Sequence, residues 1–228
     1  MPVVVLEATD IHKSYERGDE TIPVLNGLTV SLDAGSFTTL VGPSGCGKST
    51  LLHICGAMDR PTSGAVRLEG ESLDTLNDDG LTRVRRERVG FVFQFFNLLP
   101  TLTVEQNIGL PLLLKGRSVH SVAKSSGQWA ERVGISHRLN HFPSQLSGGE
   151  AQRVAIARAV IHQPVLILAD EPTGNLDSET GRTILDVLID VNRDSGAALL
   201  LATHDPVVAA AAGEVIRMRD GLITRDAS

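Results

Sequence analysis

Residues 42–50 read Gly42-Pro43-Ser44-Gly45-Cys46-Gly47-Lys48-Ser49-Thr50. They fit the pattern G-x-x-x-x-G-K-[ST]. The apolar run Phe37–Val41 before them predicts a buried strand, and residues 48–54 predict the start of a helix. Glycine lets the backbone fold tightly, so that successive N–H groups and the helix N-terminus face an anion. We therefore expect residues 42–50, the phosphate loop, to hold the phosphates of a nucleotide.

Individual side chains of the phosphate loop have distinct expected roles. Lys48 can reach the β- and γ-phosphates, and the hydroxyl of Ser49 can bind Mg²⁺. Cys46 is expected to be a small residue of the loop. The alternative is a glycine-rich turn that only joins a strand to a helix. Because the whole pattern and both flanks are present, we favour mononucleotide binding.

The composition is ordinary for a soluble globular protein. The chain has 228 residues, of which 42% are hydrophobic and 21% are charged. This length suits one large domain, or one domain with a subdomain. The formal net charge of −6 argues against binding to nucleic acid, so we expect no nucleic-acid partner. Two cysteines, Cys46 and Cys55, suit neither a disulfide framework nor a zinc site and indicate a reducing cytoplasm.

Targeting and membrane-spanning segments are not expected. The N-terminus lacks a basic region that leads into an apolar one, as a signal peptide would have. The most apolar late stretch, residues 197–212, is interrupted by His204-Asp205-Pro206, so we expect no transmembrane helix.

Strands and helices are expected to alternate along the core. Residues 1–35 are predicted to form strands, with a turn at 14–18 that carries Tyr15. The middle third is predicted to be a helical insertion, with helices at 103–115 and 119–133. A closing hairpin is predicted at 213–225.

Polar residues stand at the ends of three predicted core strands. These residues are Gln94, the pair Asp170-Glu171, and His204. Ligands bind at the carboxyl ends of the strands in an open parallel sheet. Asp170 is placed to hold Mg²⁺ or its water shell, and Glu171 to orient a water as general base. His204 is placed to bind a γ-phosphate, or has a structural role. Tyr15 is either a packing residue or an exposed ring on which a base can stack.

A second candidate anion site precedes another helix. Leu146-Ser147-Gly148-Gly149-Glu150, here called the signature segment, leads into residues 151–160, whose apolar side chains have helical spacing. One phosphate loop rarely needs another such site.

Together these motifs resemble the ATP-binding-cassette ATPases over essentially the whole chain. Many kinases and GTPases share a phosphate loop, whereas the signature segment is specific to this family. The chain is most similar to the branch of lipoprotein-release, macrolide-export, cell-division and haem-efflux ATPases, because of residues 61–64 and 169–177.

The resemblance implies an α/β fold with a P-loop NTPase core and a mostly parallel sheet. An N-terminal antiparallel β-subdomain and an inserted helical subdomain complete the single domain 1–228. The core is expected at 1–93 and 162–228, and the helical subdomain at 94–161.

The same resemblance implies a role for each motif in binding ATP and Mg²⁺. Tyr15 would stack on adenine, while Gln94 would complete the metal and water site and couple it to a membrane partner. Glu171 would be the general base, Asp170 would hold Mg²⁺ through water, and His204 would contact the γ-phosphate.

The signature segment would act between subunits. Its Ser147, Gly148 and Gly149 would contact ATP bound to a second copy, with Asp177 at the subunit interface. Many members carry Gln where this chain has Glu150, and Glu occurs in the branch named above.

The function implied is that of an ATP-hydrolysing transporter subunit. It would power export or extraction by a separate membrane permease through ATP-dependent homodimerisation, at the cytoplasmic face of the membrane. The permease would dock near Gln94 and Phe95–Leu99. The alternatives are the ATPase of a mechanically coupled, non-transporting membrane complex, a soluble cassette ATPase acting on DNA or ribosomes, and a P-loop kinase. The signature segment and the pair Asp170-Glu171 speak against the kinase.

Overall fold

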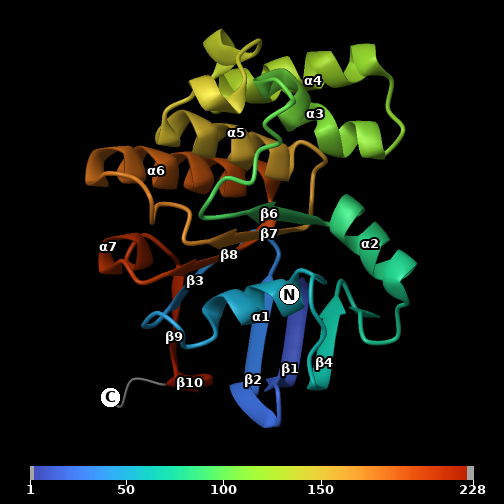
Figure 1. The fold of residues 1–228 in the computed structure, drawn as a ribbon, viewed down its shortest axis with the longest axis vertical. Coiled ribbons are helices and arrows are strands. Elements are labelled where there is room, and N and C mark those ends of the chain that lie inside the picture. Colours follow the sequence, from blue (N-terminus) through green and yellow to red (C-terminus); the bar gives the residue numbers. More distant parts are fainter. Residues whose placement is uncertain (1–2, 225–228) are drawn as a thin grey trace.

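A six-stranded sheet forms the centre of the computed structural model, which describes residues 3–224. Its strand order is β10-β9-β3-β8-β7-β6 (Figure 1). Neighbours from β9 to β6 pair in parallel, and β10 is antiparallel to β9. The strands are β3 (Phe37–Val41), β6 (Val89–Val92), β7 (Leu166–Asp170), β8 (Ala198–Thr203), β9 (Glu214–Arg219) and β10 (Leu222–Thr224). The predicted α/β fold with a mostly parallel core sheet is confirmed.

A second, antiparallel sheet with the order β2-β1-β4-β5 confirms the predicted N-terminal β-subdomain. Its strands are β1 (Val4–Arg17), β2 (Glu20–Asp33), β4 (Ser63–Leu68) and β5 (Glu71–Ser72). The turn predicted at 14–18 is wrong, because Tyr15 lies within β1, opposite Ile22. Such aromatic and β-branched cross-strand pairs favour continued strand pairing. The chain turns at residues 18–19, where Gly18 supplies a φ of 62°.

Three helices from the middle of the chain gather at one end of the molecule, remote from the N-terminal sheet (Figure 1). They are α3 (Val104–Leu114), α4 (Val119–Arg132) and α5 (Gly148–Val160), with short 3₁₀ turns η1 (Ser136–Arg138) and η2 (Pro143–Gln145) between the last two. Thr103 and Ser118 cap α3 and α4 by accepting hydrogen bonds from backbone N–H groups, as N-cap residues do. The subdomain boundary at 94–161 stays a prediction.

The remaining helices are α1 (Lys48–Cys55), α2 (Asp78–Glu87), α6 (Ser178–Ser195) and the short α7 (Pro206–Ala209), which the sequence analysis did not predict. Within residues 3–224, no helix combines the length and the apolar character that crossing a bilayer requires. The predicted hairpin is present as β9 and β10, except that residue 225 lies outside the described residues.

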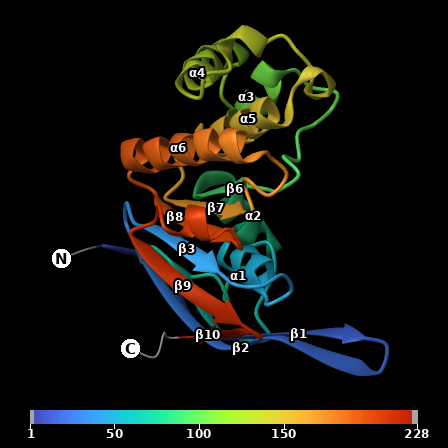
Figure 2. The same ribbon diagram turned by 90° about the vertical axis from the view of Figure 1, so that its left-hand side faces the viewer.

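The central sheet is buried on both faces. Leu168 and Leu200 point into a core with Leu52 of α1. Their strand neighbours Ile167 and Leu199 point into a second core, on the side of α5 and α6 (Figures 1 and 2). Each fully buried aliphatic side chain of this kind stabilises the fold by about 1.5–3 kcal/mol. The continuous apolar runs in the sequence follow from this burial on two sides.

A buried histidine lies after α5. His162 is 8% exposed, and its Nε2 lies 3.1 Å from the carbonyl oxygen of Val89. Burial, reinforced by the charge of Lys115, lowers the pKa of His162 from 6.5 to about 4. The folded protein therefore keeps this imidazole neutral at mildly acidic pH.

We expect the free energy of unfolding to fall by about 2–3 kcal/mol as the pH is lowered from about 6.5 to about 4. Over that range the unfolded chain binds a proton at position 162 and the folded chain does not, so acid favours unfolding. Urea denaturation of wild type and His162→Asn at several pH values measures this effect. The stability difference between the two should shrink in acid, and the exposed His120→Gln should follow wild type. A difference that stays constant with pH would contradict this account.

Candidate nucleotide site

The phosphate loop between β3 and α1 has a backbone that requires glycine. Gly45 and Gly47 have φ values of 79° and 102°, which favour glycine. A Cβ on Gly42 would lie 2.2 Å from the carbonyl oxygen of Met218 in β9, so the loop and β9 are in close contact. Because α1 begins at Lys48, its unpaired N–H groups and the positive end of its dipole face the loop.

Lys48 lies across the phosphate loop. It is 6% exposed, and its Nζ donates to the carbonyl oxygens of Gly42 (2.8 Å) and Pro43 (3.1 Å). The same nitrogen lies 3.7 Å from Oε1 of Glu171. Cys46 instead faces the core and is 4% exposed. The ammonium group thus lies at the loop, where the sequence analysis expects it to meet phosphate.

Asp170, the last residue of β7, lies beside the start of α1. Burial raises the pKa of its carboxyl group, while a hydrogen bond with Ser49 acts in the opposite direction. Within residues 3–224, its Oδ1 is buried and accepts no hydrogen bond. A buried carboxylate oxygen beside a hydroxyl suits a hard cation such as Mg²⁺. The described residues contain no cluster of three or more His, Cys, Asp or Glu that could hold a metal. A cation here would therefore also need phosphate and water oxygens.

Glu171 and His204 extend this site along the edge of the sheet. Glu171 has a φ of 45°, uncommon outside glycine, and its N–H donates to the carbonyl oxygen of Ala202. Its Oε2 lies 2.9 Å from Nδ1 of His204, and its Oε1 faces Lys48. These three residues, distant in the sequence, form a row that we call the Lys48–Glu171–His204 row. A carboxylate held in this way is suited to accept a proton from water.

Gln94 follows β6 and is paired with Asn175, which lies between β7 and α6. Asn175 donates from Nδ2 to the backbone carbonyl oxygen of Gln94 (3.0 Å), and Nε2 of Gln94 lies 3.5 Å from Oδ1 of Asn175. The place of Gln94 in the metal and water site stays a prediction.

Tyr15 is 42% exposed, as stacking on a base requires. Its hydroxyl donates to Oδ2 of Asp59 (2.9 Å), and Nζ of Lys13 lies 4.8 Å from the ring centroid. Neither neighbour of Tyr15 was predicted from the sequence. Lys13 had a signal, because residues two apart share one face of a strand. Asp59 had none, because it reaches Tyr15 from the segment after α1.

The signature segment forms the N-terminus of α5. Ser147 is the N-cap, its hydroxyl accepts from the N–H of Glu150 (3.3 Å), and Oε2 of Glu150 accepts from the N–H of Ser147 (2.8 Å). This reciprocal pair is a capping box, whose S-x-x-E spacing is visible in the sequence. The hydrogen bond from the Ser147 N–H, with help from Arg138, lowers the pKa of Glu150 to about 2. Glu150 thus remains charged at neutral pH and caps the helix.

The two signature glycines allow α5 to approach the start of α6. A Cβ on Gly149 would lie 2.5 Å from Cγ2 of Thr180, and one on Gly148 would lie 3.0 Å from Cδ2 of Leu176. Their identity therefore has a packing reason, apart from any contact with nucleotide.

The candidate residues belong to two layers. The phosphate loop, Asp170, Glu171 and His204 meet at the edge formed by the carboxyl ends of β3, β7 and β8. The signature segment belongs to the helical layer on the other face of the sheet from α1 (Figures 1 and 2). The two helix N-termini are therefore separated by the sheet.

We expect Gly149→Ala to lower the free energy of unfolding by about 1–3 kcal/mol, because its methyl group overlaps Thr180. Thr180→Ser removes that overlap and keeps the hydroxyl that donates to Asp177. Urea denaturation should therefore find Gly149→Ala/Thr180→Ser more stable than Gly149→Ala alone.

The matched control is Gly127→Ala on α4, where a Cβ would meet nothing within 4 Å. It should stabilise the protein by about 0.5–1 kcal/mol. If Gly149→Ala lowers the free energy of unfolding equally with and without Thr180→Ser, the packing explanation is ruled out.

Comparison with known proteins identifies relatives over nearly the whole chain. Residues 25–174 match the ABC transporter family. The lipoprotein-releasing system ATP-binding protein LolD of Acinetobacter baylyi is 44% identical, over 97% of this chain and 98% of LolD. The macrolide export ATP-binding/permease protein MacB of Shigella flexneri is 45% identical over 97% of this chain, which spans 34% of MacB. The dimeric ATP-binding cassette MJ0796, bound to ADP and Pi in a post-hydrolysis state, has a TM-score of 0.90 and 40% identity, covering 96% of this chain and 97% of the other.

Proposed function

The chain belongs to the ABC transporter family, and we propose from this that two copies close around ATP, hydrolyse it and drive a membrane permease. The observation that carries the proposal is the Lys48–Glu171–His204 row beside Asp170, at the sheet edge where the phosphate loop begins. The LolD and MacB relatives, named as ATP-binding proteins, support ATP binding by this chain, and the cassette in a post-hydrolysis state with ADP and Pi supports hydrolysis.

The chemistry assigns a role to each group at this edge. The N–H groups of the phosphate loop and the ammonium of Lys48 bind the β- and γ-phosphates. Ser49 and Asp170 hold Mg²⁺, which neutralises charge on those phosphates when it is bound. Glu171 accepts a proton from the attacking water, and His204, hydrogen-bonded to that carboxylate, contacts the γ-phosphate.

Two copies are needed because one chain holds its second anion-binding helix end on the other face of its sheet. In a head-to-tail pair, ATP on the phosphate loop of one copy meets Ser147, Gly148 and Gly149 of the other. The dimeric cassette bound to ADP and Pi supports the pairing of two copies. Closure then depends on the γ-phosphate, and hydrolysis favours opening.

We expect Glu171→Gln to abolish most ATP turnover, by about a hundredfold or more, and to accumulate an ATP-bound dimer. The amide keeps the shape of Glu171 but cannot accept the proton, so closure is no longer followed by hydrolysis. Phosphate release and light scattering after size exclusion in Mg-ATP measure the two effects.

The matched control is Glu179→Gln in the first turn of α6, which should keep wild-type turnover. Lys48→Ala should lose nucleotide binding and hence the dimer. A Glu171→Gln variant that stays monomeric in saturating Mg-ATP, with turnover unchanged, would refute the mechanism. It would also reopen the kinase alternative, which needs no dimer.

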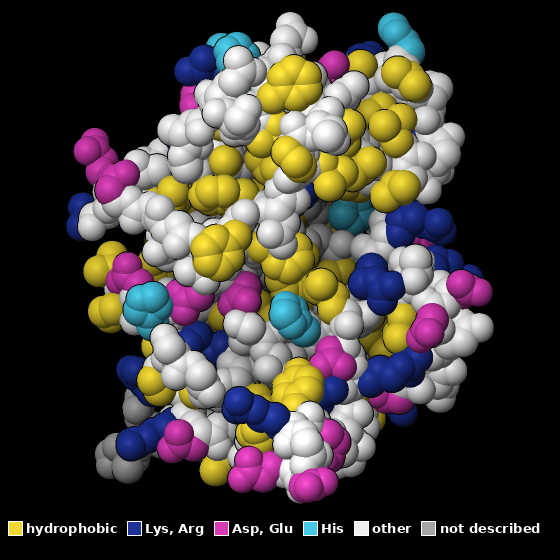
Figure 3. Space-filling view, in the orientation of Figure 1, with side chains coloured by type: hydrophobic (Ala, Val, Ile, Leu, Met, Phe, Trp, Pro, Cys, Tyr) yellow, Lys and Arg dark blue, Asp and Glu magenta, His cyan; other side chains and the backbone are white. Residues whose placement is uncertain are grey.

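A groove of ≈ 580 Å³ lies between β6, α2 and α3. Its apolar wall includes Phe91, Phe93, Leu99, Leu110, Pro111 and Leu114, and basic side chains of Arg85, Arg86 and Arg158 complete it. Figure 3 shows hydrophobic side chains of the upper half meeting Lys and Arg side chains on the right.

Arg158 of α5 fixes the backbone at this groove. Its Nη2 and Nη1 donate to the carbonyl oxygens of Phe96 (2.8 Å) and Asn97 (2.7 Å), which have φ values of 61° and 48°. Burial lowers the pKa of Arg158 to about 10, and it stays charged at neutral pH. The segment after Gln94 is thus tied directly to the helix of the signature segment.

We assign this groove to a cytoplasmic helix of the permease. An apolar face on that helix would cover Phe91 and Phe93, and acidic side chains would pair with Arg85 and Arg86. The groove includes part of the segment Phe95–Leu99, where the sequence analysis expects docking. MacB, which combines ATP-binding and permease functions, supports such a partner in this branch.

We expect Leu114→Glu to abolish co-purification with the permease, because it places a charge on the apolar wall of the groove. Nucleotide-dependent dimerisation should be unchanged, since Leu114 lies away from the phosphate loop. The measurement is affinity purification from native membranes in mild detergent, with mass spectrometry of the recovered proteins.

The matched control is Val119→Glu on α4, which is more exposed than Leu114 and lies outside the groove. It should still recover an integral membrane protein. Recovery of soluble proteins or nucleic acid alone with wild type would overturn the membrane assignment, favour the soluble cassette alternative and leave the ATPase chemistry in place. The cargo follows from the permease, and a permease without a transport path would favour the mechanically coupled alternative.

A further inference from the structure

A cluster outside the phosphate loop holds the ring of Tyr15 from two sides. Oδ2 of Asp59 accepts a hydrogen bond from the Tyr15 hydroxyl (2.9 Å), and Oδ1 accepts one from Nζ of Lys13 (2.7 Å). That ammonium also donates to the carbonyl oxygen of Arg60 (2.7 Å) and lies 4.8 Å from the ring centroid. One carboxylate therefore fixes both the phenol and the cation that covers one face of the ring.

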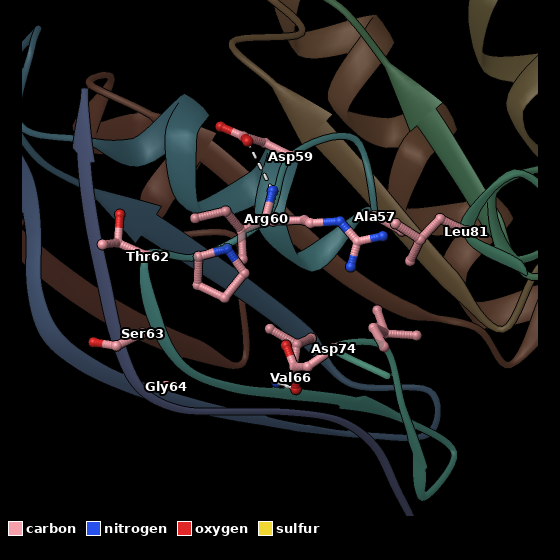
Figure 4. Close-up of a pocket in the computed structure, with 12 residues that line it drawn as sticks. Ala57, Asp59, Arg60, Thr62, Ser63, Gly64, Val66, Asp74 and Leu81 are labelled. Carbon is pink, nitrogen blue, oxygen red and sulfur yellow. Dashed lines mark hydrogen bonds between the residues drawn. The ribbon is translucent and has the colours of Figure 1, made fainter. Parts of the chain in front are cut away.

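Asp59 is itself held by a hydrogen bond within its own segment. The N–H of Arg60 donates to Oδ1 of Asp59 (2.7 Å), and Figure 4 shows the carboxylate turned away from Val66 and Asp74 across a cavity of ≈ 150 Å³. The segment continues to Thr62, whose hydroxyl accepts from the N–H of Ser14 (3.0 Å). The cavity has room for a few water molecules. This cavity is lined by the segment of Asp59 and not by Tyr15, which is 42% exposed.

The position of the ring is also fixed relative to the phosphate loop. Burial and the hydrogen bond to Asp59 raise the pKa of Tyr15, whereas a hydrogen bond with Thr50 lowers it. Thr50 lies in the first turn of α1, next to Ser49. The phenol oxygen is thus held between the end of the phosphate loop and Asp59.

We propose that Asp59 is a positioning residue that fixes the tilt of the Tyr15 ring and, through Lys13, leaves one ring face for adenine. Lys13 occupies the other face by a cation–π contact. A ring that is held in place before binding loses less entropy when a base stacks on it. The inference rests on the proposed role of Tyr15 in stacking on adenine.

The test uses ADP, because in the proposed mechanism it occupies one chain without driving closure. Displacement of a fluorescent ADP analogue by ADP and by inorganic pyrophosphate gives the affinities with and without the base. We expect Asp59→Ala to weaken ADP by about three- to tenfold, the effect of one hydrogen bond, and to leave pyrophosphate unchanged. Tyr15→Phe should lower the affinity for ADP by a similar factor. The double variant Asp59→Ala/Tyr15→Phe should bind ADP as well as the single variant with the lower affinity. In turnover, KM for ATP should rise with kcat unchanged.

A second measurement reports on the phenol itself. Tyr15 is the sole tyrosine of the chain, so near-ultraviolet absorbance follows its ionisation alone. Asp59→Ala should lower the pKa of Tyr15, because it removes a hydrogen-bond acceptor and a negative charge. The matched control is Glu16→Gln in the same strand, whose carboxylate pairs with Thr21. It should leave ADP affinity unchanged.

The outcomes separate this inference from the proposed function. If Asp59→Ala lowers the affinities for ADP and pyrophosphate equally, Asp59 has a general structural role and the inference is refuted. Additive losses of ADP affinity in the double variant would also refute it. If Tyr15→Leu weakens ADP and Asp59→Ala does not, the inference alone fails. If Tyr15→Leu leaves ADP affinity unchanged, stacking on Tyr15 fails and takes the inference with it. The ATPase assignment then still rests on Glu171.

Discussion

The parallel pairing of β3 with β8, and of β8 with β7, is the constraint on which the rest of this structure depends. Strands that run in one direction end at one edge, so the phosphate loop, Asp170 and His204 leave the sheet together. Parallel strands need crossover helices, which bury both faces of the sheet. Asp170 leaves this buried sheet with one carboxylate oxygen, Oδ1, that is itself buried and has no hydrogen-bond partner among the described residues. The chemistry of the site is in this sense a result of strand direction.

Local rules explain why much of the fold was predictable. Residues 37–41 and 103–115 carry their own signals in β-branched runs and capping residues, and β3 and α3 match them closely. The turn after β1 was misplaced because cross-strand partners of Tyr15 determine how long the hairpin continues. The pairs Gln94–Asn175 and Tyr15–Asp59 were missed because each joins segments that meet only after folding. No spacing pattern within one segment encodes such contacts.

The two glycine-rich helix starts differ in what their glycines do. In the phosphate loop, Gly45 and Gly47 adopt backbone angles that other residues disfavour. In the signature segment, Gly149 leaves room for Thr180 of α6, and Ser147 and Glu150 cap the helix together. A motif can thus be glycine-rich for conformational freedom in one place and for close packing in another. Sequence patterns alone do not distinguish the two reasons.

Through Arg158, α5 connects the groove mechanically to the signature segment. The helix has 13 residues and is about 20 Å long, with the signature segment at one end and Arg158 near the other. Arg158 donates to the carbonyl oxygens of Phe96 and Asn97 at the groove. The groove and the signature segment are therefore connected through one helix, α5. A stiff helix transmits displacement without absorbing it, so an occupant of the groove and a ligand at Ser147 would exert force on each other. Thermodynamic linkage requires that such an influence be equal in both directions.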